Sequence, residues 1–164
     1  MRNKGGIQMA LKVVRFAGLF LTGIMTGIYV HGVFSSASTK RISGAAFAET
    51  SQEVNRDFAR IMPIVGMSSL VADILTLALD RKVGSRLFAF TAAALALNIG
   101  ATVSTLRLNV PINEEVMTWK RDALPANWSE TRDRWLMGSK VRTALGLIGF
   151  TCRILATQSD TKHG

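Results

Sequence analysis

The sequence is poor in charged residues and has almost no cysteine. Charged residues make up 19% of the 164 positions, below the roughly 25% of an ordinary soluble domain. The single cysteine, Cys152, excludes an internal disulfide framework and a cysteine-based zinc site. The chain also lacks a GxSxG segment, a Walker phosphate loop and a GxGxxG turn. Hydrolase, NTPase and nucleotide-dependent dehydrogenase functions therefore have no support in it.

Hydrophobic residues, by contrast, are abundant, at 48% with a mean hydropathy of +0.25, which excludes a disordered chain. Four apolar runs stand out, at about residues 16–34, 61–79, 87–108 and 136–156. Because about 20 helical residues cross the hydrocarbon core of a bilayer, we predict an all-α fold, a four-transmembrane-helix bundle. Residues 1–164 then form a single integral-membrane domain. The first run is longer than the apolar core of a signal peptide and is predicted to be a retained helix.

The excess of positive charge, +9 overall, lies between and beside the apolar runs. This placement is typical of membrane proteins and argues against nucleic acid as a partner. The fourth run is the weakest, since it contains Lys140, Arg142 and Arg153, and it qualifies if its charged ends reach the interface. Four spans put both termini on one side of the membrane, and the basic residues there favour the cytoplasm.

The connection 35–60 is predicted to hold an amphipathic helix. Apolar side chains recur there at helical spacing while charged residues occupy the other faces. This helix is expected either to lie on the membrane surface or to extend the second span. The residues of its apolar face are Phe47, Val54, Phe58 and Ile61.

The connection 109–135 contains a proline that is expected to end the third span. Val110 precedes Pro111 and should be extended, so the helix is predicted to stop there. A second helix is expected over residues 114–124, with Asn113 as its N-cap.

Small and charged residues within the spans suggest how the helices pack. Gly23 and Gly27 form a small-xxx-small pair that allows close helix approach, either within the bundle or between two copies of the chain. Asp73 is the one acid well inside a span, where an unpaired charge is costly. Antiparallel counting places Arg153 at the same depth, which predicts a structural Asp73–Arg153 contact, with a proton relay as the alternative.

His31 is a candidate for chemistry because histidine acts as a base near neutral pH and also ligates metals or haem. It lies near the end of the first span, and the other histidine, His163, lies in the C-terminal tail. No span contains a second histidine for a bis-histidine haem, and no metal-ligand motif occurs. The alternative is an interfacial residue with no special role.

All three tryptophans fall in the second long connection or at its end. Aromatic residues gather at lipid interfaces, which accounts for them without a ligand. They also lie among polar residues that would complete a flat-walled site for an aromatic molecule. The residues concerned are Trp119, Trp128 and Trp135 with Asn109, Asn113 and Arg142.

These residues resemble a known family. The segment from Asn109 to Glu114 reads NVPINE, and Trp119, Trp128, Trp135 and Arg142 follow it. In this the chain is similar to the anthrone oxygenase-like family of small four-helix integral membrane proteins, in which an N-x-P-x-N segment closes the third helix. The resemblance covers about residues 16–156.

The resemblance implies an oxidoreductase of the monooxygenase type that acts in polyketide biosynthesis. Its substrate would be an anthrone, or a related lipophilic aromatic polyketide, oxidised by O₂ to a quinone. His31 would then be a base or a cofactor ligand, and the three tryptophans would form the pocket walls. Asn109, Asn113 and Arg142 would hold the oxyanion. No cofactor motif is identifiable in the chain.

Two other functions stay open. The chain could be a non-enzymatic membrane subunit whose glycine face and paired Asp73 serve assembly. It could also bind a lipophilic molecule in the same pocket without turnover.

Overall fold

The computed structural model describes residues 4–80 and 82–159, so Arg2 and His163 lie outside the described part. These residues form helices joined by turns, with one isolated bridge pair, Lys120–Ala123. The α-helices are α1 (Lys4–Phe34), α2 (Ser36–Thr39), α3 (Gly44–Leu79), α4 (Arg86–Ser104), α5 (Val110–Met117) and α6 (Trp128–Gln158). A π-helix, η1 (Thr105–Asn109), joins α4 to α5. The predicted all-α class is confirmed.

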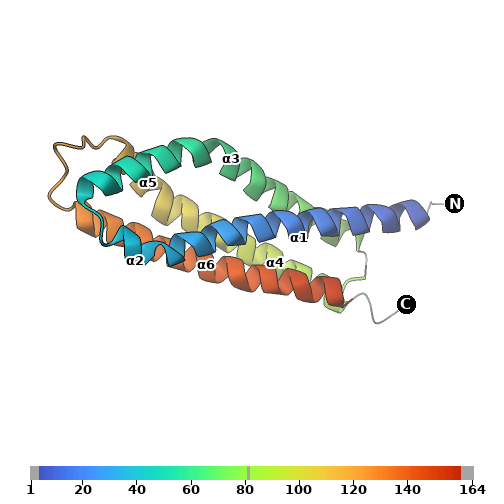
Figure 1. Ribbon diagram of the computed structural model, residues 1–164. Helices are drawn as coiled ribbons and strands as arrows, with labels where there is room; N and C mark the ends of the chain where they lie inside the picture. The colour runs from blue at the N-terminus through green and yellow to red at the C-terminus, as the bar shows by residue number, and fades with distance from the viewer. Residues whose placement is uncertain (1–3, 81, 160–164) are drawn as a thin grey trace.

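The four long helices form an elongated bundle (Figure 1). Helix α1 packs against α3 and α6, and α4 packs against the same two helices. Helix α1 begins and α6 ends at the same end of the bundle, which also holds the α3–α4 connection. We call this the termini end. The opposite end, with α2, α5 and the turn before α6, is the loop end.

Three helical stretches are long and apolar enough to cross a membrane: Gly5–Phe34, Gly44–Leu79 and Arg86–Met117. They account for the first three predicted spans. Helix α6 contains the fourth predicted span but does not meet the same criterion, because its charged residues lower its hydropathy. Many large apolar side chains of the bundle face outward, among them Phe16, Phe20 and Ile64, as expected of a surface in contact with lipid.

Helix α3 runs without interruption from the first long connection through the second span. The predicted amphipathic helix thus extends the span, which was one of the two expected alternatives. Its N-cap is Ser43, whose side chain accepts a hydrogen bond from the backbone of Ala46 at 3.3 Å. Between Gln52 and Ser69 the helix has no buried side chain, and Pro63 lies within this stretch.

The predicted end of the third helix at Val110 is wrong. Val110 is helical, with φ −59° and ψ −47°, and the helix continues through η1 into α5. A proline ring normally clashes with the carbonyl four residues back. Here the wider π-turn ends just before Pro111, and the proline falls in the first turn of α5, where no N–H is required.

The helix predicted over residues 114–124 is also wrong in extent. Helix α5 ends at Met117, and residues 118–127 form turns. Asn113 is not an N-cap, because it lies inside α5 and its side-chain oxygen accepts a hydrogen bond from Trp135. A contact distant in sequence thus determines the role of Asn113.

The loop end is held together by a small apolar core of Phe47, Ala48, Ile112, Val116 and Trp119. The amide of Gln52 donates to the carbonyls of Val116 and Trp119, at 2.9 and 3.0 Å. These bonds join α3 to the end of α5.

The two glycines of the predicted small-xxx-small pair have different surroundings. A Cβ at Gly23 would lie 3.3 Å from the Phe150 ring of α6, so Gly23 packs within the bundle. A Cβ at Gly27 would meet nothing within 4 Å. Association of two copies through this face stays a prediction.

Candidate functional site

The clearest cluster of polar and aromatic side chains lies at the loop end. We call it the Arg142 group, and it comprises Tyr29, Asn113, Trp135, Ser139 and Arg142. The guanidinium carbon of Arg142 lies 5.3 Å from the centre of the Tyr29 ring and 5.5 Å from that of Trp135. Both distances are in the range of cation–π contacts. One terminal nitrogen of Arg142 donates to Ser139 Oγ at 3.2 Å.

Two nitrogens of the Arg142 group, Arg142 Nε and the amide nitrogen of Asn113, form no hydrogen bond in the part of the chain that the structure describes. Arg142 Nε is buried and has no partner. Asn113 Oδ1 accepts from the indole of Trp135 at 2.8 Å, and no bond uses the Asn113 amide nitrogen among these residues. The Arg142 guanidinium is charged and lies where water is partly excluded. A hydrogen bond from such a donor is stronger there than in water.

Asn109 is adjacent to this group but is oriented away from it. Its side chain is fully buried, and its amide nitrogen donates to the Trp135 carbonyl at 3.0 Å. Its oxygen has no partner within the described residues and faces Gly138, where an added Cβ would lie only 2.8 Å away. In this orientation Asn109 links η1 to α6 and offers an acceptor, whereas an oxyanion requires a donor.

All three tryptophans touch the apolar core of the loop end, but they do not all reach the Arg142 group. Trp119 and Trp128 pack against Phe47, with ring centres 6.3 and 6.5 Å from it, in the apolar core of the loop end. Arg132 lies 5.1 Å above the Trp128 ring. Only Trp135 contacts both Arg142 and Asn113, so it is the tryptophan that belongs to the polar site.

His31 lies on α1 with an exposed side chain. Two residues along an α-helix correspond to about 200°, so His31 and Tyr29 point in nearly opposite directions. In the described part of the chain no hydrogen bond or ion pair joins the imidazole to the Arg142 group. No set of three or more His, Cys, Asp or Glu side chains is arranged there for a metal ion.

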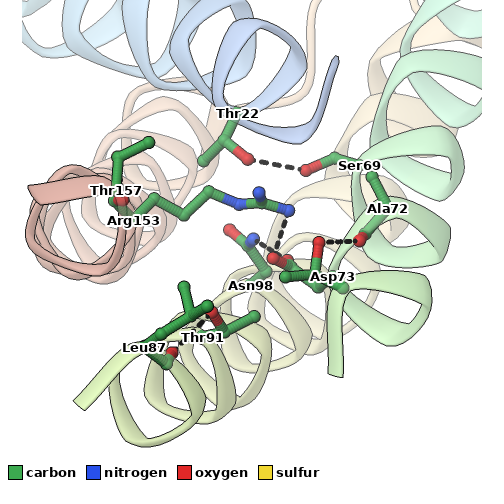
Figure 2. A network of polar contacts seen from close by, with 10 residues as sticks. Thr22, Ser69, Ala72, Asp73, Leu87, Thr91, Asn98, Arg153 and Thr157 are labelled. Carbon is green, nitrogen blue, oxygen red and sulfur yellow. Dashed lines mark hydrogen bonds and ion pairs between the residues drawn. The ribbon is translucent and has the colours of Figure 1, made fainter. Parts of the chain in front are cut away.

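A second polar cluster lies deeper in the bundle, toward the termini end (Figure 2). Asp73 and Arg153 form the ion pair expected from antiparallel counting, and both side chains are almost fully buried. Asn98 donates to the second carboxylate oxygen of Asp73 at 2.9 Å. Beside them, the hydroxyls of Thr22 and Ser69 are hydrogen-bonded at 2.8 Å.

Gly18 on α1 leaves room for one partner of this ion pair. A Cβ at Gly18 would overlap the guanidinium of Arg153, so a larger residue there would displace that group from its place between α1 and α6. The pairing neutralises two charges that would each be costly in a membrane interior.

Sequence reasoning assigned no role to Tyr29, Ser139 or Asn98. Tyr29 is the single tyrosine of the chain, and its position one helical turn before the end of the first span was the available signal. Its ring packs on α6 at Gly146, where a Cβ would lie 2.9 Å from it. That contact could not be inferred, because it depends on the rotation of α1 relative to α6.

A comparison with protein-family models matches residues 53–152 to the anthrone oxygenase model. The chain belongs to the anthrone oxygenase family. The resemblance seen in the sequence is thereby confirmed. Searches of curated proteins and of solved structures gave no match. The region matched to the anthrone oxygenase model contains Asn113, Trp135 and Arg142, while Tyr29 and His31 on α1 precede it.

Proposed function

We propose that the protein is a membrane oxygenase that oxidises an anthrone, or a related lipophilic phenolic polyketide, to the quinone with O₂. The family assignment supports the class of reaction. The observation that carries the proposal is Arg142 Nε, which is buried and has no partner among the described residues. The guanidinium lies between the rings of Tyr29 and Trp135, and Trp135 is bonded to Asn113.

The reaction needs little beyond a base and a site for negative charge. The ring CH₂ of an anthrone loses a proton, and the resulting anion is delocalised onto the carbonyl oxygen. Its carbon is oxidised as it forms a bond to O₂, which is reduced to a peroxide. The protonated hydroperoxide then loses water to give the second carbonyl, so anthrone and O₂ become quinone and water.

The Arg142 group supplies donors for the anionic oxygen. Arg142 Nε and the amide nitrogen of Asn113 would donate to it, while the rings of Tyr29 and Trp135 hold the guanidinium in place. Donors that are already in place stabilise the developing negative charge well, because they need not reorient during the reaction. Asn109, through its bond to the Trp135 carbonyl, is a positioning residue.

We assign His31 as the candidate base, and its position limits where the substrate can lie. Its exposed imidazole points away from Tyr29, so it reaches only a substrate that lies along the outer face of α1. Two hollows among the described residues have volumes of about 20 and 10 Å³, whereas small-molecule sites occupy roughly 300–1,000 Å³. The substrate therefore has to dock from the bilayer against the half-buried rings, or displace side chains.

This proposal includes α6 as a fourth membrane span. Its charged side chains would otherwise oppose insertion, but Arg142 stacks between two aromatic rings and Arg153 pairs with Asp73. Lys140 is exposed and lies toward the loop end, where it can reach the interface. With four spans both termini lie on one side, and the basic residues of the termini end favour the cytoplasm.

The test measures quinone formation from emodin anthrone by membranes that contain the protein, against membranes without it, because anthrones autoxidise. The proposal predicts a rate well above the control, and a lower rate in Asn113→Ala. Turnover that persists in both His31→Ala and Asn113→Ala would remove these site assignments. A rate equal to the control, with folded protein, would favour a carrier if the aromatic ligand binds, or a subunit if a fixed partner co-purifies.

A further inference from the structure

A small hollow lies between α1, α3, α4 and α6, between the Arg142 group and the Asp73–Arg153 pair. Its volume is about 20 Å³, and a site of roughly 10–15 Å³ on this measure is enough for one water molecule. Its polar lining comes from Thr26, Tyr29, Ser69, Asn98 and Thr102. It therefore touches both polar clusters, through Tyr29 at one end and Asn98 at the other.

Several hydrogens of these polar groups are already used. Thr102 Oγ1 donates to the Asn98 carbonyl at 2.9 Å, and Thr26 Oγ1 donates to the Gly146 carbonyl at 3.4 Å. The Asn98 amide nitrogen donates to Asp73, and its Oδ1 accepts no bond from any described residue. What the lining offers is mainly acceptor oxygens.

An occupant that donates hydrogen bonds fits such a lining, and dioxygen or a hydrocarbon does not. A buried water typically makes about three hydrogen bonds to polar groups of this kind. Here it would donate to Asn98 Oδ1 and to the hydroxyl oxygen of Tyr29. It would accept from Ser69, whose hydroxyl lines the hollow and is available when Thr22 is the donor within the Thr22–Ser69 pair.

We propose that a water molecule occupies this hollow and connects the Asp73–Arg153 pair to Tyr29 of the Arg142 group. A second hollow of about 10 Å³ lies on the termini side of the pair, lined by Thr76, Thr91, Arg153 and Thr157 among others. The two hollows flank the ion pair, so polar groups follow one another along the bundle from the termini end to the loop end. Asp73 is thereby linked to the water through hydrogen bonds of Asn98. The inference does not depend on the oxygenase proposal.

The experiment uses the full chain in lipid bilayers and measures magnetisation transfer by NMR from water to the side-chain nitrogens of Asn98 and Arg153. Rapid transfer to Asn98 is expected in the wild type. Gly66→Ala should reduce it several-fold, because Gly66 lines the hollow and the added methyl lies 3.8 Å from its nearest neighbour, Met25 Cε. Alanine is also the better helix former, so the fold is retained.

Gly100→Ala is the matched control, since its methyl would pack on Leu145 at 3.6 Å, outside the hollow. Transfer to Asn98 in this variant should equal that of the wild type. A wild type with no transfer from water to Asn98, or a Gly66→Ala variant with undiminished transfer, would overturn the proposal. Because no substrate is involved, either result is independent of whether the protein turns over an anthrone.

Discussion

Removing the carboxylate of Asp73 tests whether the buried ion pair holds the bundle together. In Asp73→Asn the amide has nearly the same shape as the carboxylate, so packing is retained and only the charge is lost. Arg153, whose side chain is 4% exposed, then has a charge in the bundle interior with no counter-ion. Breaking a buried pair from one side costs about 3–5 kcal/mol, and we expect the free energy of unfolding to fall by that amount.

The physical cause is isolated by two further variants. Replacing both partners, as in Asp73→Leu with Arg153→Met, removes the unpaired charge and should recover most of the stability. Gly18→Ala leaves both charges in the sequence but places a methyl where the Arg153 guanidinium lies, so it should also destabilise the bundle. Gly27→Ala, on the same helix with open space around it, is the matched control.

Unfolding in mixed micelles with increasing SDS, followed by tryptophan fluorescence, measures these differences. The reasoning predicts a large loss for Asp73→Asn, a substantial loss for Gly18→Ala and little change for Gly27→Ala. It would be refuted if Asp73→Asn were as stable as the wild type, or if the double replacement were less stable than Asp73→Asn.

Two further predictions concern the loop end. Gln52→Leu leaves the Val116 and Trp119 carbonyls without their donor. The free energy of unfolding, measured in the same assay, should fall by about 1–3 kcal/mol. A neutral effect would mean that water replaces the amide. Gly138→Ala forces Asn109 away from α6, because the added Cβ would lie 2.8 Å from its Oδ1. Overpacking of this kind costs about 1–3 kcal/mol, and altered fluorescence of Trp135, relative to Gly100→Ala, would report the shift; unchanged stability and spectrum would contradict it.

The helices themselves could be predicted from the apolar runs. The second run was expected to end at Leu79, where α3 ends, and the first at Phe34, where α1 ends. The Asp73–Arg153 contact also followed from the sequence, since an acid inside a span needs a partner and one arginine lay at the same depth. These predictions depend on local composition and on helix geometry alone.

The details of the site could not be predicted, because they depend on contacts between distant segments. Pro111 ordinarily ends a helix, but here a π-turn precedes it and the helix continues. From the sequence, Trp119 and Trp135 could each belong to an interfacial belt or to a ligand pocket. In the structure Trp119 is part of the apolar core, whereas Trp135 also contacts Arg142. The role of Asn113 likewise follows from the approach of α6 to α5, which no local pattern encodes.

The most direct test of the oxygenase account compares two arginines that each stack on a tryptophan at the loop end. Arg142→Met removes the charged donor of the Arg142 group, whereas Arg132→Met removes a stacked cation from Trp128, outside that group. Quinone formation from emodin anthrone is measured in membranes with equal amounts of folded protein. The account predicts that wild type and Arg132→Met exceed protein-free membranes while Arg142→Met falls to their rate. Wild-type turnover that persists undiminished in Arg142→Met would contradict it.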